Sequence, residues 1–476
     1  MFSKYRKSYE ALFRQNNKLE TVERKPLNKF DVIVVGAGTG GCLAAKTVAA
    51  AGLKVCMIDQ KTENKIGDKV CGDAIGKHHF DSINLTHPSG AELEQKIEGI
   101  KVYSPNMETV ITVKGEGIHG YLVNRQLFGQ RLLKEAKDAG ATLMTSTIVT
   151  EPIIKDGLVV GVSTKDPKTG ENNDIFAQVV LDASGHSAVL RKKLTPEFGI
   201  ETEVKDEDVE VCYREIREVK QTVSDKGFCK IYLDLKRFPG GYCWIFPKSS
   251  TKVNVGLGVA MVKGFPNPKK LYHEFVLPLP LFKGSRALTG GGGLVPTRRP
   301  ISSMVGNGVI IIGDAACQVN PIHGGGIGSS MMGGVKAAEV IIDALEKRDV
   351  SRETLWPYTG MFMELYGAKQ AGLDIFRMFL QRLTNKELNY GMQHHLITDD
   401  DLLKASMGED LKLNITEKTS RLFKGLGSLS LLRKLNATAK LMKQIKSLYR
   451  NYPSSPDGLR EWEEKTQAVV EKAKKL

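Results

Sequence analysis

Cysteine is scarce in this sequence, with seven residues among 476. The number is odd and no two cysteines have the spacing of a zinc or iron–sulfur site, which argues against a disulfide framework and predicts no metal centre. No run of 18 apolar residues occurs, so no segment is expected to span a bilayer. Residues 1–29 offer no apolar core of a secretory signal. We therefore expect a reduced, cytoplasmic chain with mostly buried thiols.

Nucleic-acid signatures are also missing, because no zinc-finger spacing or RNP motif occurs. We predict no nucleic-acid partner, although the formal net charge is +14. A basic chain of this kind is suited to a phosphorylated substrate or an anionic membrane surface. Apolar residues make up 41% and charged residues 26%, as in globular proteins, and the length predicts two or three domains.

Glycine is abundant, with 48 residues, and one cluster carries the first motif. Residues 31–35 form a β-branched apolar run that leads directly into Gly-Ala-Gly-Thr-Gly-Gly at 36–41. A helix is predicted over 43–51 and a second strand over 54–58, which ends at Asp59. Strand, glycines, helix, strand and acid in this order predict a dinucleotide site.

Each residue of the motif has a physical role. Gly36 permits the tight turn, Gly38 lets a pyrophosphate approach the backbone, and Gly41 allows the helix to pack closely on the strand. The helix N-terminus offers N–H groups to the phosphates. Asp59 is placed to accept hydrogen bonds from ribose hydroxyls.

Two later segments favour a flavin over a nicotinamide. Residues 179–185 read as a strand that runs into an Asp-Ala-Ser-Gly turn, and residues 308–314 read as a buried strand that ends in Gly-Asp. A second glycine-rich loop, 324–326, then precedes a small-residue helix over 329–338. One dinucleotide needs one such loop for its pyrophosphate, so a second suits a cofactor with a ring carbonyl that carries charge, as reduced flavin does.

The order of these motifs resembles that of the p-hydroxybenzoate-hydroxylase-like FAD enzymes. The resemblance implies that FAD is the cofactor, with Asp314 at its ribityl or pyrophosphate region and Gly326 and Ile327 beside the isoalloxazine. Arg125 matches the arginine that opens a helix near the cofactor in that group. Taken without the resemblance, Arg125 is an ordinary surface residue.

Residues 205–290 have a different pattern, with short alternating segments that predict antiparallel strands. They include Pro-Gly-Gly-Tyr-Cys-Trp-Ile-Phe-Pro at 239–247. Alternation places Tyr242, Trp244 and Phe246 on one face of a strand. Such a row is either ordinary core or the wall of an apolar cavity.

This segment resembles the P-x-x-Y-x-W-x-F-P signature of the geranylgeranyl reductases and matches all five of its fixed residues. The resemblance, which covers residues 30–460, implies that the three aromatic residues line a lipid tunnel and hold an isoprenoid against the flavin. Cys71, Gly72 and Ala74 match the Cys-Gly loop that faces the flavin in that family.

The implied reaction is the FAD-dependent reduction of C=C double bonds in geranylgeranyl chains, on archaeal-type membrane lipid precursors or on the free diphosphate. An isolated alkene has no polar group that the protein could hydrogen-bond, so the reaction needs a hydride from reduced flavin N5, a proton, and exclusion of water.

Candidates for the proton relay are Cys71, His323 and Tyr242, and Trp244 joins Tyr242 in offering a π-face to positive charge. An FAD monooxygenase or epoxidase acting on an isoprenoid is the alternative. The external electron donor, ferredoxin or NADPH, stays open.

The substrate is expected to carry a phosphate or diphosphate head. Lys77, His78 and His79 follow the Cys-Gly loop and are candidates to bind it, although a solvated helix face explains them as well.

Residues 418–456 hold nine Lys or Arg and no acid, interleaved with apolar residues that include Leu422, Phe423, Leu426 and Leu435. This stretch is either a packed helical cap or a peripheral contact with the inner face of the cell membrane.

The expected fold class is α/β followed by α. It combines a Rossmann-like FAD-binding domain with a parallel sheet, a substrate domain with a mixed or antiparallel sheet, and a helical C-terminal region. The expected boundaries are a basic extension at 1–29, an FAD-binding domain at 30–90, 120–190 and 290–345, a substrate domain at 91–119 and 200–289, and the helical region at 346–476.

Overall fold

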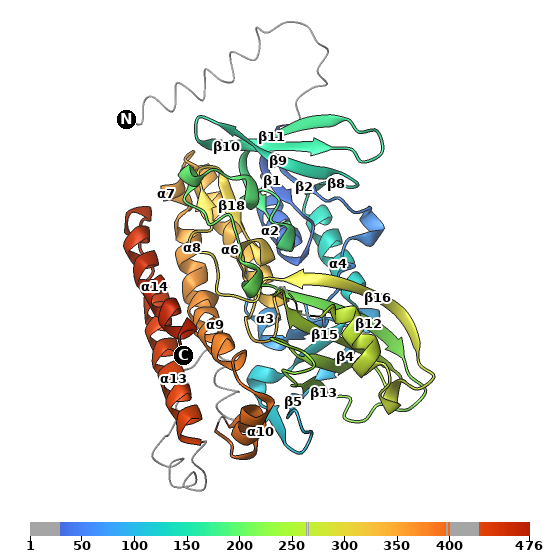
Figure 1. Cartoon of the computed structure of the whole chain (residues 1–476). Helices are drawn as coiled ribbons and strands as arrows, with labels where there is room; N and C mark the ends of the chain where they lie inside the picture. The colour runs from blue at the N-terminus through green and yellow to red at the C-terminus, as the bar shows by residue number, and fades with distance from the viewer. Residues whose placement is uncertain (1–28, 263, 265, 397, 400–427) are drawn as a thin grey trace, which may run out of the picture.

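The computed structural model describes residues 29–262, 264, 266–396, 398–399 and 428–476 (Figure 1). The expected N-terminal extension therefore lies outside the described residues except for residue 29. Leu422, Phe423 and Leu426 of the basic stretch also lie outside them. The architecture is α/β with a helical C-terminal region, so the expected fold class is confirmed.

The first sheet contains the glycine-motif strand at its centre. Its parallel core runs in the order β18, β11, β1, β2, β8, as expected for a dinucleotide-binding sheet, and β17, β10 and β9 join through antiparallel pairs. The strands are β1 (Lys29–Val35), β2 (Val55–Ile58), β8 (Thr142–Met144), β9 (Ile148–Lys155), β10 (Leu158–Lys165), β11 (Asn172–Asp182), β17 (Val305–Gly306) and β18 (Val309–Ile311).

Helices α2 (Thr39–Ala50), α4 (Arg125–Asp138) and α6 (Ile327–Glu346) pack around this sheet. Helix α2 begins four residues before the expected start at 43, because Gly40 and Gly41 already adopt helical conformation. Both glycines serve close packing. A Cβ on Gly41 would lie 2.0 Å from the carbonyl oxygen of Gly36, and a Cβ on Gly40 would lie 2.6 Å from the backbone of α6.

The second sheet holds the aromatic segment. Its seven strands run in the order β16, β12, β15, β14, β13, β5, β6, and only the pair of β13 with β5 is parallel. One face packs on α5 (Pro268–Leu271) and the adjoining π-helix η8 (Tyr272–Val276). The strands are β5 (Gly99–Tyr103), β6 (Val110–Lys114), β12 (Glu210–Glu218), β13 (Phe228–Tyr232), β14 (Cys243–Pro247), β15 (Lys252–Ala260) and β16 (Arg286–Val295).

A third, three-stranded sheet was not expected from the sequence. It consists of β3 (Ala74–Gly76), β7 (Gly120–Val123) and β4 (Leu93–Ile97), in the order β3, β7, β4. Helix α3 (Lys77–Asp81) follows β3 directly. The Cys-Gly loop therefore leads directly into the first strand of the third sheet.

The C-terminal helices form a layer on one side of the molecule, with α13 and α14 outermost (Figure 1). Within the described ranges no helix is both long and apolar enough to cross a bilayer. The helices are α7 (Arg352–Leu355), α8 (Pro357–Phe362), π-helix η11 (Met363–Gly367), α9 (Ala368–Leu380), α10 (Asn385–Gln393), α13 (Ser428–Arg450) and α14 (Leu459–Lys474).

Short 3-10 turns connect several of these elements. They are η1 (Glu63–Lys65), η2 (Gly90–Glu92), η3 (Glu116–Ile118), η4 (Gly185–Ser187), η5 (Arg191–Lys193), η6 (Pro196–Phe198), η7 (Asp206–Asp208), η9 (Pro280–Phe282), η10 (Gly313–Ala316) and η12 (Pro456–Gly458).

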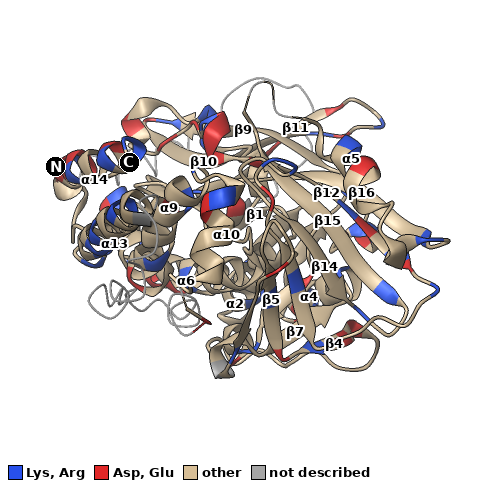
Figure 2. Ribbon diagram, turned by 60° about the horizontal axis from the view of Figure 1, so that its bottom comes forward, with Lys and Arg blue, Asp and Glu red and all other residues tan. Residues whose placement is uncertain are grey.

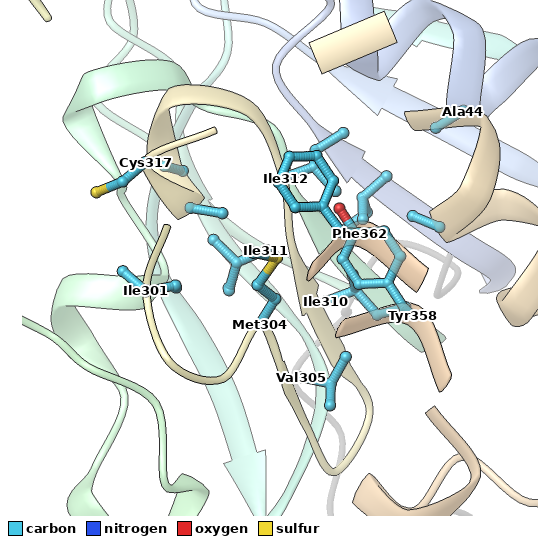
Figure 3. Close-up of a cluster of buried hydrophobic side chains, with 14 of the residues drawn as sticks. Ala44, Ile301, Met304, Val305, Ile310, Ile311, Ile312, Cys317, Tyr358 and Phe362 are labelled. Carbon is cyan, nitrogen blue, oxygen red and sulfur yellow. The ribbon is translucent and has the colours of Figure 1, made fainter. Parts of the chain in front are cut away.

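The largest core cluster joins the first sheet to the C-terminal helices. Figure 3 shows Ile310 and Ile312 of the β18 segment beside Tyr358 and Phe362 of α8, with Met304 next to them. All five side chains are at most 1% exposed. Full burial of such a side chain contributes roughly 1.5–3 kcal/mol, so this contact fixes the helical layer on the dinucleotide-binding sheet.

Candidate active site

The glycine loop after β1 is shaped to receive a ligand. Gly36 has φ of +101°, in the region that favours glycine, and a Cβ there would lie 2.6 Å from the carbonyl oxygen of Ala183. Gly38 faces open space, because no atom lies within 4 Å of the position of its Cβ. The Asp59 carboxylate, at the end of β2, accepts the backbone N–H of Ala37 at 2.9 Å. Asp59 therefore supports the loop and keeps further lone pairs for ribose hydroxyls.

Arg125 stands at the first position of α4, whose N-cap Asn124 accepts the N–H of Leu127. The residue is 8% exposed, and its Nε and Nη1 have no hydrogen-bond partner among the described residues. An unsatisfied buried donor costs about 1–3 kcal/mol, so this guanidinium is suited to an anionic ligand.

The second glycine-rich loop lies beside an ion pair. Asp314, in η10, binds the Lys69 ammonium at 2.8 Å. A Cβ on Gly326 would lie 3.2 Å from Asp314 Oδ1, and Ile327 begins α6 immediately after it. Asp182, fully buried at the end of β11, accepts the N–H groups of Leu190 and Arg191 and so fixes the Asp-Ala-Ser-Gly turn. The two predicted loops and the turn thus surround the N-termini of α2 and α6.

Cys71 lies on a loop held by the second sheet. Its carbonyl oxygen accepts Asn254 Nδ2 at 2.7 Å and Arg214 Nε at 3.2 Å, and Arg214 Nη2 also binds the Lys69 carbonyl at 3.0 Å. The Cys71 thiol accepts the N–H of Asp73 at 3.3 Å. Gly72 needs its small size, because a Cβ there would lie 3.0 Å from the Phe246 ring. Strand β3 begins at Ala74, which packs on the aromatic cluster that includes Phe246.

A buried ion network lies behind this loop. Lys248, 3% exposed, binds the Asp73 carboxylate, the Val123 carbonyl at 3.0 Å and Glu94 Oε2 at 2.6 Å. Asn254 binds the same Asp73 oxygen at 2.9 Å. The network joins the loop, the third sheet and the second sheet. No local pattern in the sequence reveals these residues or Arg214, because each pairs with a partner far away in the chain.

The three aromatic residues lie on one face of the second sheet, as their alternation predicts. Trp244 and Phe246 are 7% and 8% exposed, Tyr242 packs beside them, and the intervening Cys243 and Ile245 join the core of the opposite face. The Trp244 indole N–H donates to Asn254 Oδ1 at 2.9 Å, and the ring lies over Gly256. The row therefore faces the Cys71 loop.

Tyr242 and His323 join this face to the second glycine-rich loop. The Tyr242 hydroxyl donates to the His323 carbonyl oxygen at 2.8 Å. Burial, together with nearby Glu210, raises the pKa of Tyr242 well above its ordinary value, so the phenol keeps its proton. The His323 side chain is accessible, yet desolvation by surrounding protein lowers its pKa to about 4, and its Nδ1 accepts the N–H of Gly325. His323 is therefore a neutral imidazole near pH 7.

Several basic side chains gather next to this loop. His79 Nδ1 lies 3.0 Å from the Tyr366 hydroxyl, and its ring packs against Gly328 of α6. His78 lies beside it, with ring centroids 4.0 Å apart. Burial, with the charge of nearby Lys446, lowers the pKa of Lys369 to about 8, and burial, with the charge of Lys369, lowers the pKa of both histidines. We call His78, His79, His323, Tyr366 and Lys369 the basic cluster.

The residues present fit FAD. The open space at Gly38 suits a pyrophosphate, and the unsatisfied donors of Arg125 suit an anion. The described residues contain no cluster of three or more metal-ligating side chains, and all seven cysteines are free thiols.

Comparisons with known proteins agree with this geometry. Residues 31–210 match the model of the FAD dependent oxidoreductases, and residues 208–295 match that of the geranylgeranyl reductase catalytic domain. A digeranylgeranylglycerophospholipid reductase of Sulfolobus acidocaldarius is 45% identical over 93% of this chain and 97% of that protein. One from Methanothrix thermoacetophila is 35% identical over 81% of this chain and 96% of that protein.

The fold has a solved counterpart as well. A geranylgeranyl bacteriochlorophyll reductase-like protein from Thermoplasma acidophilum superposes with a TM-score of 0.72 at 22% identity, covering 87% of this chain and all of that one. Flavin-dependent halogenases share the fold more distantly, among them one solved with FAD at a TM-score of 0.59. Because this chain spans nearly the full length of relatives well above 30% identity, it belongs to the family of the digeranylgeranylglycerophospholipid reductases.

Proposed function

We propose that this chain reduces the C=C double bonds of geranylgeranyl chains in archaeal-type membrane lipid precursors, with FAD as its cofactor. The observation that carries the proposal is the position of the aromatic face. Phe246 touches Gly72 of the Cys71 loop, and Tyr242 binds the second glycine-rich loop through His323. An apolar sheet face thus meets both loops that border the cofactor site, and the relatives are named as reductases of such lipids.

FAD is held by the glycine motifs in this proposal. Gly36, Gly38 and Gly41 form the pyrophosphate loop, Asp59 binds the ribose, and Arg125 supplies its free donors to an anionic part of the cofactor. Asp314 lies at the ribityl or pyrophosphate region of the cofactor, and Gly326 and Ile327 border the flavin ring, together with Cys71, Gly72 and Ala74. When bound and reduced, FAD supplies the electron pair and one hydrogen that an alkene needs.

The apolar chain of the substrate lies on Tyr242, Trp244 and Phe246. An alkene offers nothing to hydrogen-bond, so the protein orients it by contact area and keeps water away. Asn254 fixes the indole of Trp244, and the His323 carbonyl fixes the ring of Tyr242. Cys71 completes the wall opposite Phe246, and the π-faces favour positive charge that develops on the alkene.

The basic cluster is the proposed site of the phosphate head. Burial lowers the pKa values of His78, His79 and Lys369; the charge of Lys369 adds to the effect on both histidines, and the charge of Lys446 adds to the effect on Lys369. A bound phosphate reverses both effects by pairing with their protonated forms. His79 Nδ1 and the Tyr366 hydroxyl already share a hydrogen bond that orients them.

Helix α13 is the proposed contact with the membrane. It contains no acidic residue, and Arg433, Lys440, Lys443 and Arg450 are exposed on it; Figure 2 shows blue segments along α13. Basic residues near an anionic surface contribute about 1 kcal/mol each. The triple variant R433E/K440E/K443E should release the protein from vesicles that contain anionic lipid, whereas binding that is unchanged in sedimentation would contradict this contact.

The electron donor is external in this proposal, because the single G-x-G-x-x-G motif serves FAD. Ferredoxin and NADPH are both compatible with the chain. Anaerobic mixing of oxidised enzyme with each donor, followed by flavin absorbance, identifies the one that reduces it.

Anaerobic single turnover tests the proposal. Chemically reduced enzyme is mixed with digeranylgeranylglyceryl phosphate, and recovery of the oxidised-flavin absorbance is followed in time. We expect reoxidation without oxygen, and slower reoxidation in Trp244→Phe, which loses the bond to Asn254. The control Tyr232→Phe alters a tyrosine on the opposite face of the same sheet and should behave as wild type. Flavin that stays reduced until oxygen enters would favour the monooxygenase instead.

A further inference from the structure

A buried carboxyl group lies on the same sheet face as the aromatic residues. Strand β12 directs Glu210, Cys212 and Arg214 to one side, because side chains alternate along a strand. Arg214 on this side binds the Cys71 loop, and Cys212 joins the apolar cluster of Trp244. Glu210 is therefore the acidic member of a row that faces the proposed reaction site.

The glycine at position 258 brings this row next to Tyr242. Gly258 of β15 pairs with Cys212 of β12, and its N–H donates to the Tyr242 carbonyl at 3.0 Å. A Cβ on Gly258 would lie 3.2 Å from Glu210 Oε2 and 3.1 Å from the Cys212 sulfur. Both side chains thus reach into the space that the glycine leaves, beside the first residue of the aromatic row.

The environment of Glu210 favours a neutral acid. The residue is 5% exposed, and its carboxyl forms no hydrogen bond or ion pair with any side chain or backbone group in the described part of the chain. Arg377 of α9, whose charge acts to lower the pKa of Glu210, already forms ion pairs with Asp374 and Asp208. Cys212 and Tyr242 are the other titratable groups that face it. Burial raises the pKa of Glu210 to about 7.

We propose that Glu210 is the acid that gives its proton to the reacting alkene. The assignment rests on the proposed function. The π bond opens, one carbon forms a C–H bond with the proton of Glu210, and the other takes a hydrogen with its electron pair from reduced FAD. The alkene is reduced, FAD is oxidised, and Glu210 is left as a carboxylate that water reprotonates between turnovers.

The neighbouring groups suit this role less well. Burial, together with the charge of Glu210, raises the pKa values of Cys212 and Tyr242 far above neutrality. A proton donor works best when its pKa lies near the working pH. Glu210 meets that condition on this face, and Tyr242 can orient the substrate without giving up its proton.

Glu210→Gln tests the assignment, because it keeps the shape and removes the acid. The matched control is Glu215→Gln on the same strand, whose carboxylate faces the opposite side and binds Arg217 and Tyr272. In anaerobic single turnover, flavin reoxidation by the lipid should slow about 100-fold in E210Q, within the range for general acid catalysis. The wild-type rate should fall as pH rises through about 7, and E215Q should keep that profile.

An infrared titration of the resting holoenzyme gives a second readout that does not depend on turnover. We expect a protonated-carboxyl C=O band that disappears as pH rises through neutrality, that is absent from E210Q and that persists in E215Q. If the wild type turns over and E210Q turns over at the same rate, or if the wild type lacks this band, the role of Glu210 is overturned while the proposed function stands. A wild-type enzyme that never reoxidises with the lipid would overturn the proposed function and this assignment with it.

Discussion

Replacement of Lys248 by methionine tests how the Cys71 loop is held. Lys248 Nζ lies within ion-pair distance of Asp73 and Glu94, and the side chains of the three residues are 4%, 2% and 10% exposed. Methionine keeps the volume of the buried stem and removes the charge. Asp73 would then remain in the interior without its cation, whereas Glu94 keeps Lys252 at 2.5 Å, and Asp73 Oδ1 already has no hydrogen-bond partner among the described residues.

The expected loss of stability is large. Removal of one partner from a buried ion pair costs about 3–5 kcal/mol, because the remaining charge stays desolvated. A typical domain is stable by only about 5–15 kcal/mol. The matched control is Lys134→Met, whose i,i+4 pair with Asp138 has side chains 75% and 60% exposed. An exposed pair of this kind contributes at most about 1 kcal/mol.

Urea unfolding measures both variants, with FAD fluorescence as a second probe of the loop. Lys248→Met should lower the free energy of unfolding by at least about 3 kcal/mol and weaken FAD binding. The double variant Asp73→Asn/Lys248→Met should be more stable than the sum of the two single changes predicts, by about 0.5–3 kcal/mol. A Lys248→Met protein as stable as Lys134→Met would show that the buried ion network does not hold the loop.

Three further predictions concern the cofactor and the acid. The methyl group of Gly38→Ala fits the open space beside the loop, so the melting temperature should stay unchanged while FAD affinity falls about tenfold in a fluorescence titration. Arg125→Met removes donors that have no partner among the described residues, so the apoprotein should be no less stable while FAD binding weakens by about 2 kcal/mol, about 30-fold; unchanged affinity would contradict the anion site. Glu210 has its pKa raised to about 7, so its contribution to stability is full below its unfolded pKa of about 4.3 and is lost as pH rises through 7. Compared with Glu210→Gln, the wild type should therefore lose about 3 kcal/mol between about pH 4 and about pH 8 in urea titrations.

Short-range patterns account for the parts of the site that the sequence predicts. The turn at Gly36, the acid at Asp59 and the one-sided aromatic row follow from spacings of a few residues, which strand and helix geometry converts directly into positions. The start of α2 was missed because Gly40 and Gly41 have low helix propensity. Tertiary contact of these glycines with β1 and α6 outweighs that preference.

The parts of the site that the sequence does not predict depend on pairs of residues far apart in the chain. Lys248 is 175 residues from Asp73 and Asn254 is 183 residues from Cys71, so no local pattern reveals either contact. The three-residue strand β3 is too short to show a period. A weak signal existed for Glu210, since polar residues at 210 and 214 alternate with apolar Val211 and Tyr213 and thus indicate a polar position on a buried strand.

The central claim is that this chain saturates isoprenoid double bonds on a lipid, and product mass tests it most directly. Enzyme reduced in the absence of oxygen is incubated with digeranylgeranylglyceryl phosphate, and the lipid is extracted for mass spectrometry. We expect products heavier by about 2 Da for each double bond, from the two hydrogens added. A lipid that keeps its mass without oxygen, and gains about 16 Da of oxygen once air is admitted, would contradict it and identify a flavin monooxygenase.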